Sequence, residues 1–139
     1  MFKKTNRNSK TMKASDLRIG NWVNIFLNDV DYNTIQIKVD DLYYIIQKNG
    51  VYEPIPLTEE WLTKFGFKYI NTESSYLTYA EPSHNYYLQM DVRKSDNKWI
   101  ILDNTMSELI AFAMVDIIYV HQLQNLYFAL TGEELIIKE

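Results

Sequence analysis

Apolar and polar residues alternate with a period of about two in the first third of the chain, the pattern of half-buried β-strands. Trp22–Phe26 is one β-rich run, Ile35–Val39 alternates strictly, Leu42–Gln47 is a third candidate, and Val51–Glu53 is a fourth. Four short strands within roughly forty residues predict a small SH3-like β-barrel or a curved meander over residues 16–57.

The pattern then changes to a helical one. Thr58 can cap a helix, Glu59 and Glu60 fall in its first turn, and Gly66 suits a left-handed position after its last turn. Apolar residues at helical spacing begin at Trp61. We therefore predict a compact helix over residues 58–66.

An antiparallel meander is expected next. Its strands are predicted at Tyr76–Tyr79, Tyr86–Arg93 and Lys98–Leu102, because apolar and polar residues alternate between turn signals. The segment Thr105–Val115 begins with a capping-box pattern, while Val115–Val120 is rich in β-branched residues. The expectation there is a short helix followed by a short strand.

The stretch from Ile117 to Gly132 has a helical pattern and no Asp, Glu, Lys or Arg, in a chain that is 23% charged. A solvated helix normally carries charge on its outer face, so both faces of this one are expected to meet protein or a partner. One side of this predicted helix is apolar and is expected to pack over the predicted antiparallel meander. The opposite column, read as a structural or partner-binding motif, is His121, Gln124, Asn125 and Phe128.

These elements predict an α+β fold, with a barrel-like lobe followed by an antiparallel sheet covered by the C-terminal helix. A chain of 139 residues that is 47% hydrophobic can bury one core. We expect a flexible basic arm over residues 1–15 and a single domain over residues 16–139, comprising the barrel-like lobe (16–57), the helix (58–66), and the meander with its C-terminal helix (67–139).

Charged residues are distributed unevenly along the chain. Residues 1–18 contain six basic residues and one acidic residue, a net +5, whereas the remaining 121 residues contain eight basic and seventeen acidic residues, a net −9. Such an acidic body disfavours general coating of nucleic acid but suits basic clefts, including those of nucleic-acid enzymes. Ordinary solubility is the simpler explanation. The candidate nucleic-acid contacts are the basic residues Lys3, Lys4, Arg7, Lys10, Lys13 and Arg18.

The sequence contains no recognisable catalytic or cofactor motif. It has no cysteine, its two histidines, His84 and His121, lie far apart, and its four glycines are isolated. Adjacent acidic residues such as Glu59 and Glu60 point in different directions, which is poor geometry for a catalytic pair. We therefore expect no enzyme, no cofactor and no metal. With no signal peptide and no apolar run of about 18 residues, the expected location is the cytoplasm, without membrane attachment.

Eleven tyrosines form the remaining conspicuous feature. Adjacent residues on a strand point to opposite faces, so at least one tyrosine of each adjacent pair should be exposed or half-exposed. Exposed tyrosine is favoured at binding surfaces, although tyrosine also simply favours strands. The candidate aromatic contact surface is Tyr44, Tyr79 and Tyr87.

Three blocks carry a family resemblance: residues 16–21 (DLRIGN), residues 52–67 (YEPIPLTEEWLTKFGF) and residues 119–135 (YVHQLQNLYFALTGEEL). They resemble a family of small proteins of Bacteroidota phages and mobile elements that has no established activity. The resemblance implies a phage-encoded accessory protein in the cytoplasm of a host cell.

Two functions are expected from these features. The first is a non-enzymatic protein that binds a host protein. The example we expect is an anti-defence inhibitor of the anti-CRISPR type, which binds an RNA-guided nuclease. The alternative is a nucleic-acid-associated phage accessory protein that binds RNA or DNA through its basic arm and small barrel. RNA could also be reached through the protein partner. The oligomeric state is left open.

Overall fold

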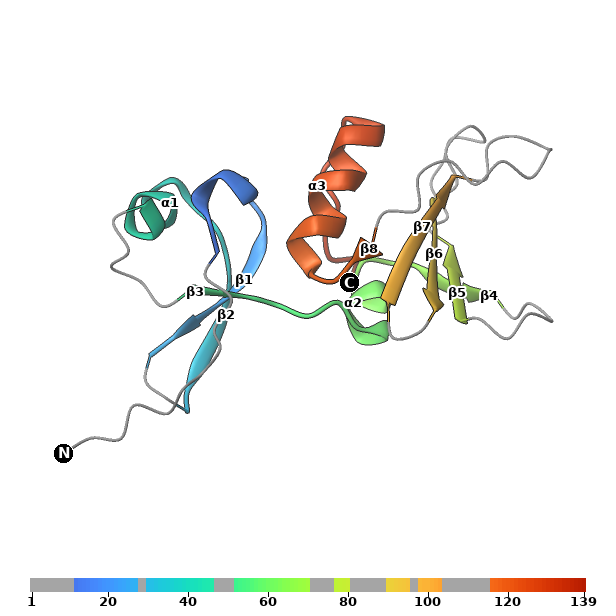
Figure 1. The fold of residues 1–139 in the computed structure, drawn as a ribbon, viewed down its shortest axis with the longest axis horizontal. Helices are drawn as coiled ribbons and strands as arrows, with labels where there is room; N and C mark the ends of the chain where they lie inside the picture. Colours follow the sequence, from blue (N-terminus) through green and yellow to red (C-terminus); the bar gives the residue numbers. More distant parts are fainter. Residues whose placement is uncertain are drawn as a thin grey trace. The chain divides into compact units, whose positions relative to one another are not determined.

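The computed structural model describes residues 12–27, 30–46, 52–70, 77–80, 90–95, 98–103 and 116–139. The chain divides into two compact units, Met1–Ile55 and Pro56–Glu139 (Figure 1). The division falls next to residue 57, where the predicted barrel-like lobe ends. Within the described residues, no helix combines the length and the apolar character needed to cross a membrane.

Where the first unit is described, it contains a small antiparallel sheet and one α-helix. Its elements are η1 (Ala14–Asp16), β1 (Trp22–Phe26), β2 (Tyr32–Gln36), α1 (Val39–Ile46) and β3 (Tyr52–Pro54). The sheet order is β2-β1-β3, so β2 and β3 are its edge strands. Pro54 lies in an edge strand, where its missing N–H removes no bond from a central ladder.

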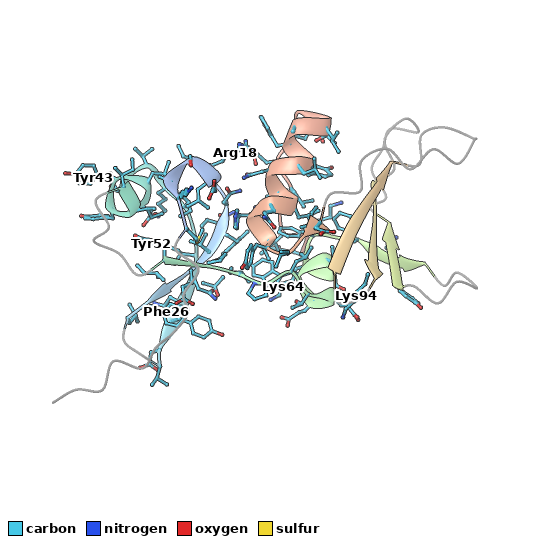
Figure 2. The ribbon with its side chains drawn as sticks, viewed as in Figure 1. Arg18, Phe26, Tyr43, Tyr52, Lys64 and Lys94 are labelled. Atoms are coloured by element: carbon cyan, nitrogen blue, oxygen red, sulfur yellow. The ribbon has the colours of Figure 1, made fainter. Side chains whose placement is uncertain are left out.

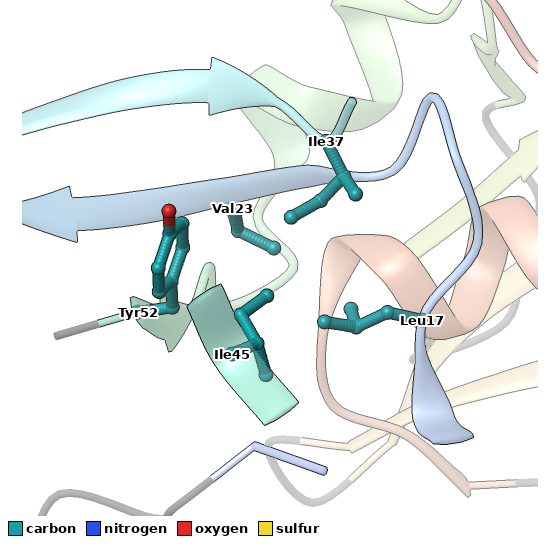
Figure 3. Packing of buried hydrophobic residues seen from close by; sticks show 5 residues of the cluster. All are labelled: Leu17, Val23, Ile37, Ile45 and Tyr52. Carbon is teal, nitrogen blue, oxygen red and sulfur yellow. The ribbon is translucent and has the colours of Figure 1, made fainter. Parts of the chain in front are cut away.

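One face of this sheet packs against α1. The core cluster contains five buried apolar residues. Val23, Ile45 and Tyr52 come from β1, α1 and β3, whereas Leu17 and Ile37 directly follow η1 and β2 (Figure 3). Val23 lies opposite Ile35 in the β1–β2 register, and Ile35 packs against the same cluster. Alternation in β1 and β2 thus gives the sheet one apolar face, as predicted.

The prediction of a third strand at Leu42–Gln47 is wrong, and the prediction of a closed barrel is therefore wrong too. Residues 39–46 form α1 instead, and the sheet of the first unit is open, with three strands. The side chain of Asp41 accepts a hydrogen bond from the backbone N–H of Lys38 at 2.8 Å and caps the first turn. Leu42 and Ile45 then face the core three residues apart, which is a helical spacing.

The described part of the second unit contains a five-stranded antiparallel sheet and two α-helices. Its elements are α2 (Glu59–Lys64), β4 (Lys68–Ile70), β5 (Leu77–Ala80), β6 (Met90–Ser95), β7 (Lys98–Asp103), β8 (Asp116–Ile117) and α3 (Val120–Thr131). The sheet order is β4-β5-β6-β7-β8, and each pair is antiparallel. The predicted meander and the short strand before the last helix are confirmed where residues are described. β4 was not predicted, and the predicted helix after Thr105 lies outside the described residues.

Helix α2 has the signals that the sequence predicts. The hydroxyl of Thr58 accepts a hydrogen bond from the backbone N–H of Trp61 at 3.4 Å, and Gly66 adopts a left-handed φ of 87°. Trp61, Leu62 and Phe65 are buried. Lys64 forms an ion pair with Glu60 at 2.7 Å.

Helix α3 starts and ends near the predicted limits. The side-chain oxygen of Gln122 accepts hydrogen bonds from the N–H groups of Ile118 and Tyr119 at 2.9 and 3.0 Å, which satisfies donors at the helix start. Gly132 ends the helix with a left-handed φ of 74°. The mixed α+β class and the C-terminal helix are thus confirmed. That α3 also covers strands 77–103 stays a prediction.

Candidate protein-binding surface

Helix α1 is anchored to the first unit by its inner side. Ile45 is buried and Leu42 packs against the same core. Asp41 adds a polar link, because its second carboxylate oxygen accepts a hydrogen bond from the hydroxyl of Tyr52 at 3.1 Å. The helix is therefore fixed in place by residues that face the sheet.

The outer side of α1 is apolar and exposed. Val39, Tyr43 and Ile46 follow one another at spacings of four and three residues, so they share one face. Their exposed fractions are 66%, 60% and 61%. Figure 2 shows Tyr43 on the side of α1 that faces away from the sheet. We call these three residues, together with Tyr44, the α1 face.

The aromatic part of the α1 face is ordered by contact between its own rings. Tyr43 and Tyr44 have ring centroids 5.9 Å apart with an edge-to-face angle of 72°, and Tyr44 is 50% exposed. On a helix, adjacent side chains are separated by about 100° rather than 180°. Both tyrosines of this pair therefore reach solvent, which agrees with the prediction that at least one of them is exposed, although the element is a helix and not the predicted strand.

Two acidic residues and the exposed Lys38 lie at the start of the α1 face. Asp40 and Asp41 lie in the first turn of the helix, and its last turn has no basic residue. Asp40 is exposed and Asp41 half-buried. Burial and the hydrogen bond to Asp41 raise the pKa of Tyr52 to about 12, because both favour the neutral phenol that donates to the carboxylate. The apolar face thus has a carboxylate edge.

Three residues of the predicted motif on α3 are buried or half-buried in the structure. Gln124 is 1% exposed and donates a hydrogen bond from its side-chain amide to the backbone carbonyl of Leu135 at 3.5 Å. His121 is 6% exposed, and its ring stacks with that of Tyr119 at a centroid distance of 5.7 Å. Asn125 is half-buried. These side chains therefore contact the chain itself rather than open solvent.

The arrangement of the α3 faces differs from the prediction. Gln124 follows Val120 by four residues and belongs to the same buried face, with Leu123 and Tyr127 beside it. The prediction placed Gln124 in an opposite column, which is wrong. The prediction that both sides are enclosed also fails in the last turn, where Phe128 and Leu130 are exposed.

The chain after α3 returns to α2. Leu135 is buried, and the backbone N–H of Lys138 donates to the carbonyl of Lys64 at 2.8 Å. A bridge between Pro56 and Tyr119, and a hydrogen bond from the Leu57 N–H to the Ile118 carbonyl, join the start of this unit to the start of α3. Segments of its own unit thus contact the start of the uncharged helix and its buried face, whereas its last turn stays exposed.

The other predicted contact residues are only partly described. Lys13 is exposed and Arg18 half-buried, whereas Lys3, Lys4, Arg7 and Lys10 lie outside the described residues. Tyr87 also lies outside them, and of Tyr79 only the backbone, in β5, is described. The structure therefore gathers Tyr44 with Val39, Tyr43 and Ile46, and the rest of the predicted aromatic surface lies outside what it describes.

The sequence prediction missed Val39, Tyr43 and Ile46 as surface residues. A signal was present, since the segment from Val39 to Ile46 has apolar residues on every side of a helix but is too short to bury them all. Two acidic residues in its first turn also favour a helix over a strand.

The acidic and histidine side chains of the described residues form no cluster of the kind that holds a metal ion. Across the described ranges, no group of three or more His, Asp or Glu side chains lies close enough together to hold a metal ion. The exposed α1 face is thus the best-defined candidate site in the described structure.

Comparison with known proteins gives this chain no relative: no family model, no curated protein and no solved structure matches it.

Proposed function

We propose that this chain works without catalysis, by binding another protein through the α1 face. The observation that carries the proposal is the row Val39, Tyr43 and Ile46, each at least 60% exposed on one side of a helix whose other side is anchored. An amphipathic helix that presents such a row to a groove is a recurrent mode of protein recognition.

The charge beside the row indicates the chemistry of the partner. Asp40 lies next to it, and α1 contains no lysine or arginine. The best-fitting partner has an apolar groove with basic residues at its rim, because opposite charges steer association and suppress wrong partners. Tyrosine supplies a large contact area at a low entropic cost.

The setting we propose is the cytoplasm of a phage-infected host cell, with an RNA-guided nuclease as the partner and inhibition of defence as the result. Such a nuclease has basic channels for nucleic acid. The net charge of −9 on residues 19–139 and the resemblance to Bacteroidota phage proteins support this setting. This setting is a more specific proposal than binding through the α1 face, and an experiment can contradict it without contradicting that binding mode.

The test of the binding mode is a comparative affinity purification. The tagged full chain is incubated with nuclease-treated Bacteroidota lysate, beside a variant with Val39→Gln, Tyr43→Gln and Ile46→Gln. The matched control carries Phe128→Gln and Leu130→Gln, which remove exposed apolar residues from α3 instead. We expect one stoichiometric protein whose recovery falls at least about tenfold with the α1 variant only. Equal recovery with all three chains would contradict the proposal.

The setting is tested by cleavage of target DNA. The purified chain is added to the captured nuclease with its guide RNA, and inhibition is expected from the wild type but not from the α1 variant. A captured partner that is no nuclease would overturn the anti-defence role and leave the binding mode in place.

A second candidate function is binding of RNA or DNA through the basic N-terminal segment. The net +5 of residues 1–18 favours it, and Lys13 is exposed. This candidate predicts affinity that falls steeply with salt and is lost when residues 1–13 are deleted. Binding that survives the deletion would exclude the segment as the contact.

A further inference from the structure

Strand β2 forms an edge of the first unit's sheet among the described residues, and it contains neither of the residue types that most often block an edge, a charged residue or a proline. In the order β2-β1-β3, no described strand pairs with its outer side. Its five residues, Tyr32 to Gln36, include no charged residue and no proline. Natural edge strands are usually blocked by lysine, proline or a bulge, because open N–H and C=O groups pair readily with another strand.

The hydrogen-bond pattern shows which backbone groups of β2 point outward. The Leu27 N–H donates to the Asp31 carbonyl at 2.9 Å, and the Ile37 N–H donates to the Asn21 carbonyl at 2.8 Å. Hydrogen-bonded pairs alternate along an antiparallel ladder, so Asn33 and Ile35 also bond to β1. The N–H and C=O groups of Tyr32, Thr34 and Gln36 therefore point to the open side.

We propose that β2 pairs with β2 of a second copy of this chain, antiparallel and centred on Thr34. The three outward-pointing residues are placed symmetrically about Thr34, so this register puts Tyr32 opposite Gln36 of the second copy and Thr34 opposite Thr34. Each is a hydrogen-bonded pair, giving about six bonds across the junction. The product is a continuous sheet with the order β3-β1-β2-β2-β1-β3.

Side chains and charges agree with this register. Thr34 is exposed, and its hydroxyl donates to the side-chain oxygen of Asn24 at 2.8 Å, which fixes it on the outer face, where threonine pairs are favourable. Asp31 and Lys38, both exposed, lie just beyond the two ends of β2. The two-fold symmetry brings Asp31 of each copy towards Lys38 of the other. That complementarity favours a second copy over an unrelated strand.

The association is expected to be weak. A junction of two five-residue strands buries less than the roughly 1,600 Å² of a standard stable interface. The dimer should therefore form with increasing concentration rather than persist on dilution. It involves a different surface from the α1 face, so it does not depend on the proposed function.

The test is sedimentation equilibrium of the full chain over a range of concentrations. The wild type is expected to show a monomer–dimer equilibrium. Thr34→Lys and Thr34→Glu each place like charges opposite one another on the symmetry axis and should weaken dimerisation at least about fivefold. An equimolar mixture of the two variants should restore it, because opposite charges then meet. The control Ile136→Lys, at an exposed site in the second unit, should dimerise like the wild type.

A second measurement identifies the axis directly. The chain has no cysteine, so Thr34→Cys introduces a single thiol, and two such residues would lie about 5.5 Å apart between Cα atoms, within reach of a disulfide. Mild oxidation should crosslink this variant but not Ile136→Cys. A wild type that stays monomeric, charged variants that dimerise normally, a mixture without rescue, or equal crosslinking of both cysteine variants would overturn the proposal.

Discussion

Helices α1 and α3 both lack lysine and arginine, yet they place their apolar side chains differently. α3 buries Val120, Leu123 and Tyr127, and it buries His121 and Gln124 with them. α1 buries only Ile45 and exposes Val39, Tyr43 and Ile46. The part of α3 up to Tyr127 is therefore uncharged and enclosed by its own unit, whereas its last turn is uncharged and exposed.

The contrast also shows where a partner would gain most from contact. Exposed apolar residues on α1 are already held in place, so covering them requires little further ordering of the chain. The most apolar part of α3 is covered, and only its last turn offers exposed residues. The predictions below test this division of roles, in order of decreasing expected effect on the free energy of unfolding.

Leu123→Ala should have the largest effect. Leu123 is fully buried in α3, so its truncation leaves a cavity and should lower the free energy of unfolding by about 2–5 kcal/mol in urea titrations. Ile46→Ala on the α1 face is the matched change and should cost less than about 0.5 kcal/mol. Equal losses for the two variants would show that the helices do not differ as described.

Gln124→Ala should come next. The change removes a buried amide that donates to the Leu135 carbonyl and should lower the free energy of unfolding by about 1–3 kcal/mol. Asn125→Ala, at the half-buried neighbour, should cost less. A thermal melt of Gln124→Ala that matches the wild type would mean that the contact with the C-terminal segment contributes nothing.

Gly132→Ala tests the end of α3. Its φ of 74° is left-handed, so a Cβ atom should cost about 1 kcal/mol, measured by the same urea titration. Gly132→Asn is the control, because asparagine tolerates this conformation better and should cost less. If the asparagine variant were the less stable of the two, backbone strain would not be the cause.

The link between Tyr52 and α1 should depend on pH. Because the folded state raises the pKa of Tyr52 from 10.0 to about 12, its contribution is fully present below pH 10 and is lost as the pH rises through about 12. Tyr52→Phe should flatten the decline in stability over this interval, measured by urea titrations at stepped pH. An unchanged slope would indicate that the phenol is not held by Asp41.

Much of the second unit could be predicted from local signals. Thr58 and Gly66 mark the ends of α2, and alternation locates β6 and β7. These signals work because capping and strand alternation depend on neighbouring residues only. β4 has three residues, too few to give a pattern.

The first unit was harder to predict, because its alternation continues past the end of the strand. Ile35 and Ile37 face the core, but Val39 begins α1 and is exposed. The cap formed by Asp41 on the N–H of Lys38 overrides the apparent strand pattern. Once α1 is recognised as a short helix with apolar residues on every side, some of them must be exposed, but which ones are exposed depends on the distant segments that cover the helix, and no short motif encodes that.

Tyrosine nitration, mapped by mass spectrometry of the full free chain, tests the central contrast in one measurement. Tyr43 and Tyr44 on α1 are 60% and 50% exposed, whereas Tyr127 on α3 is 6% exposed. We expect rapid nitration of the first two and protection of Tyr127 until the chain unfolds. Nitration of Tyr127 at the rate of Tyr43, or an unreactive Tyr43, would contradict the division of roles between the two helices.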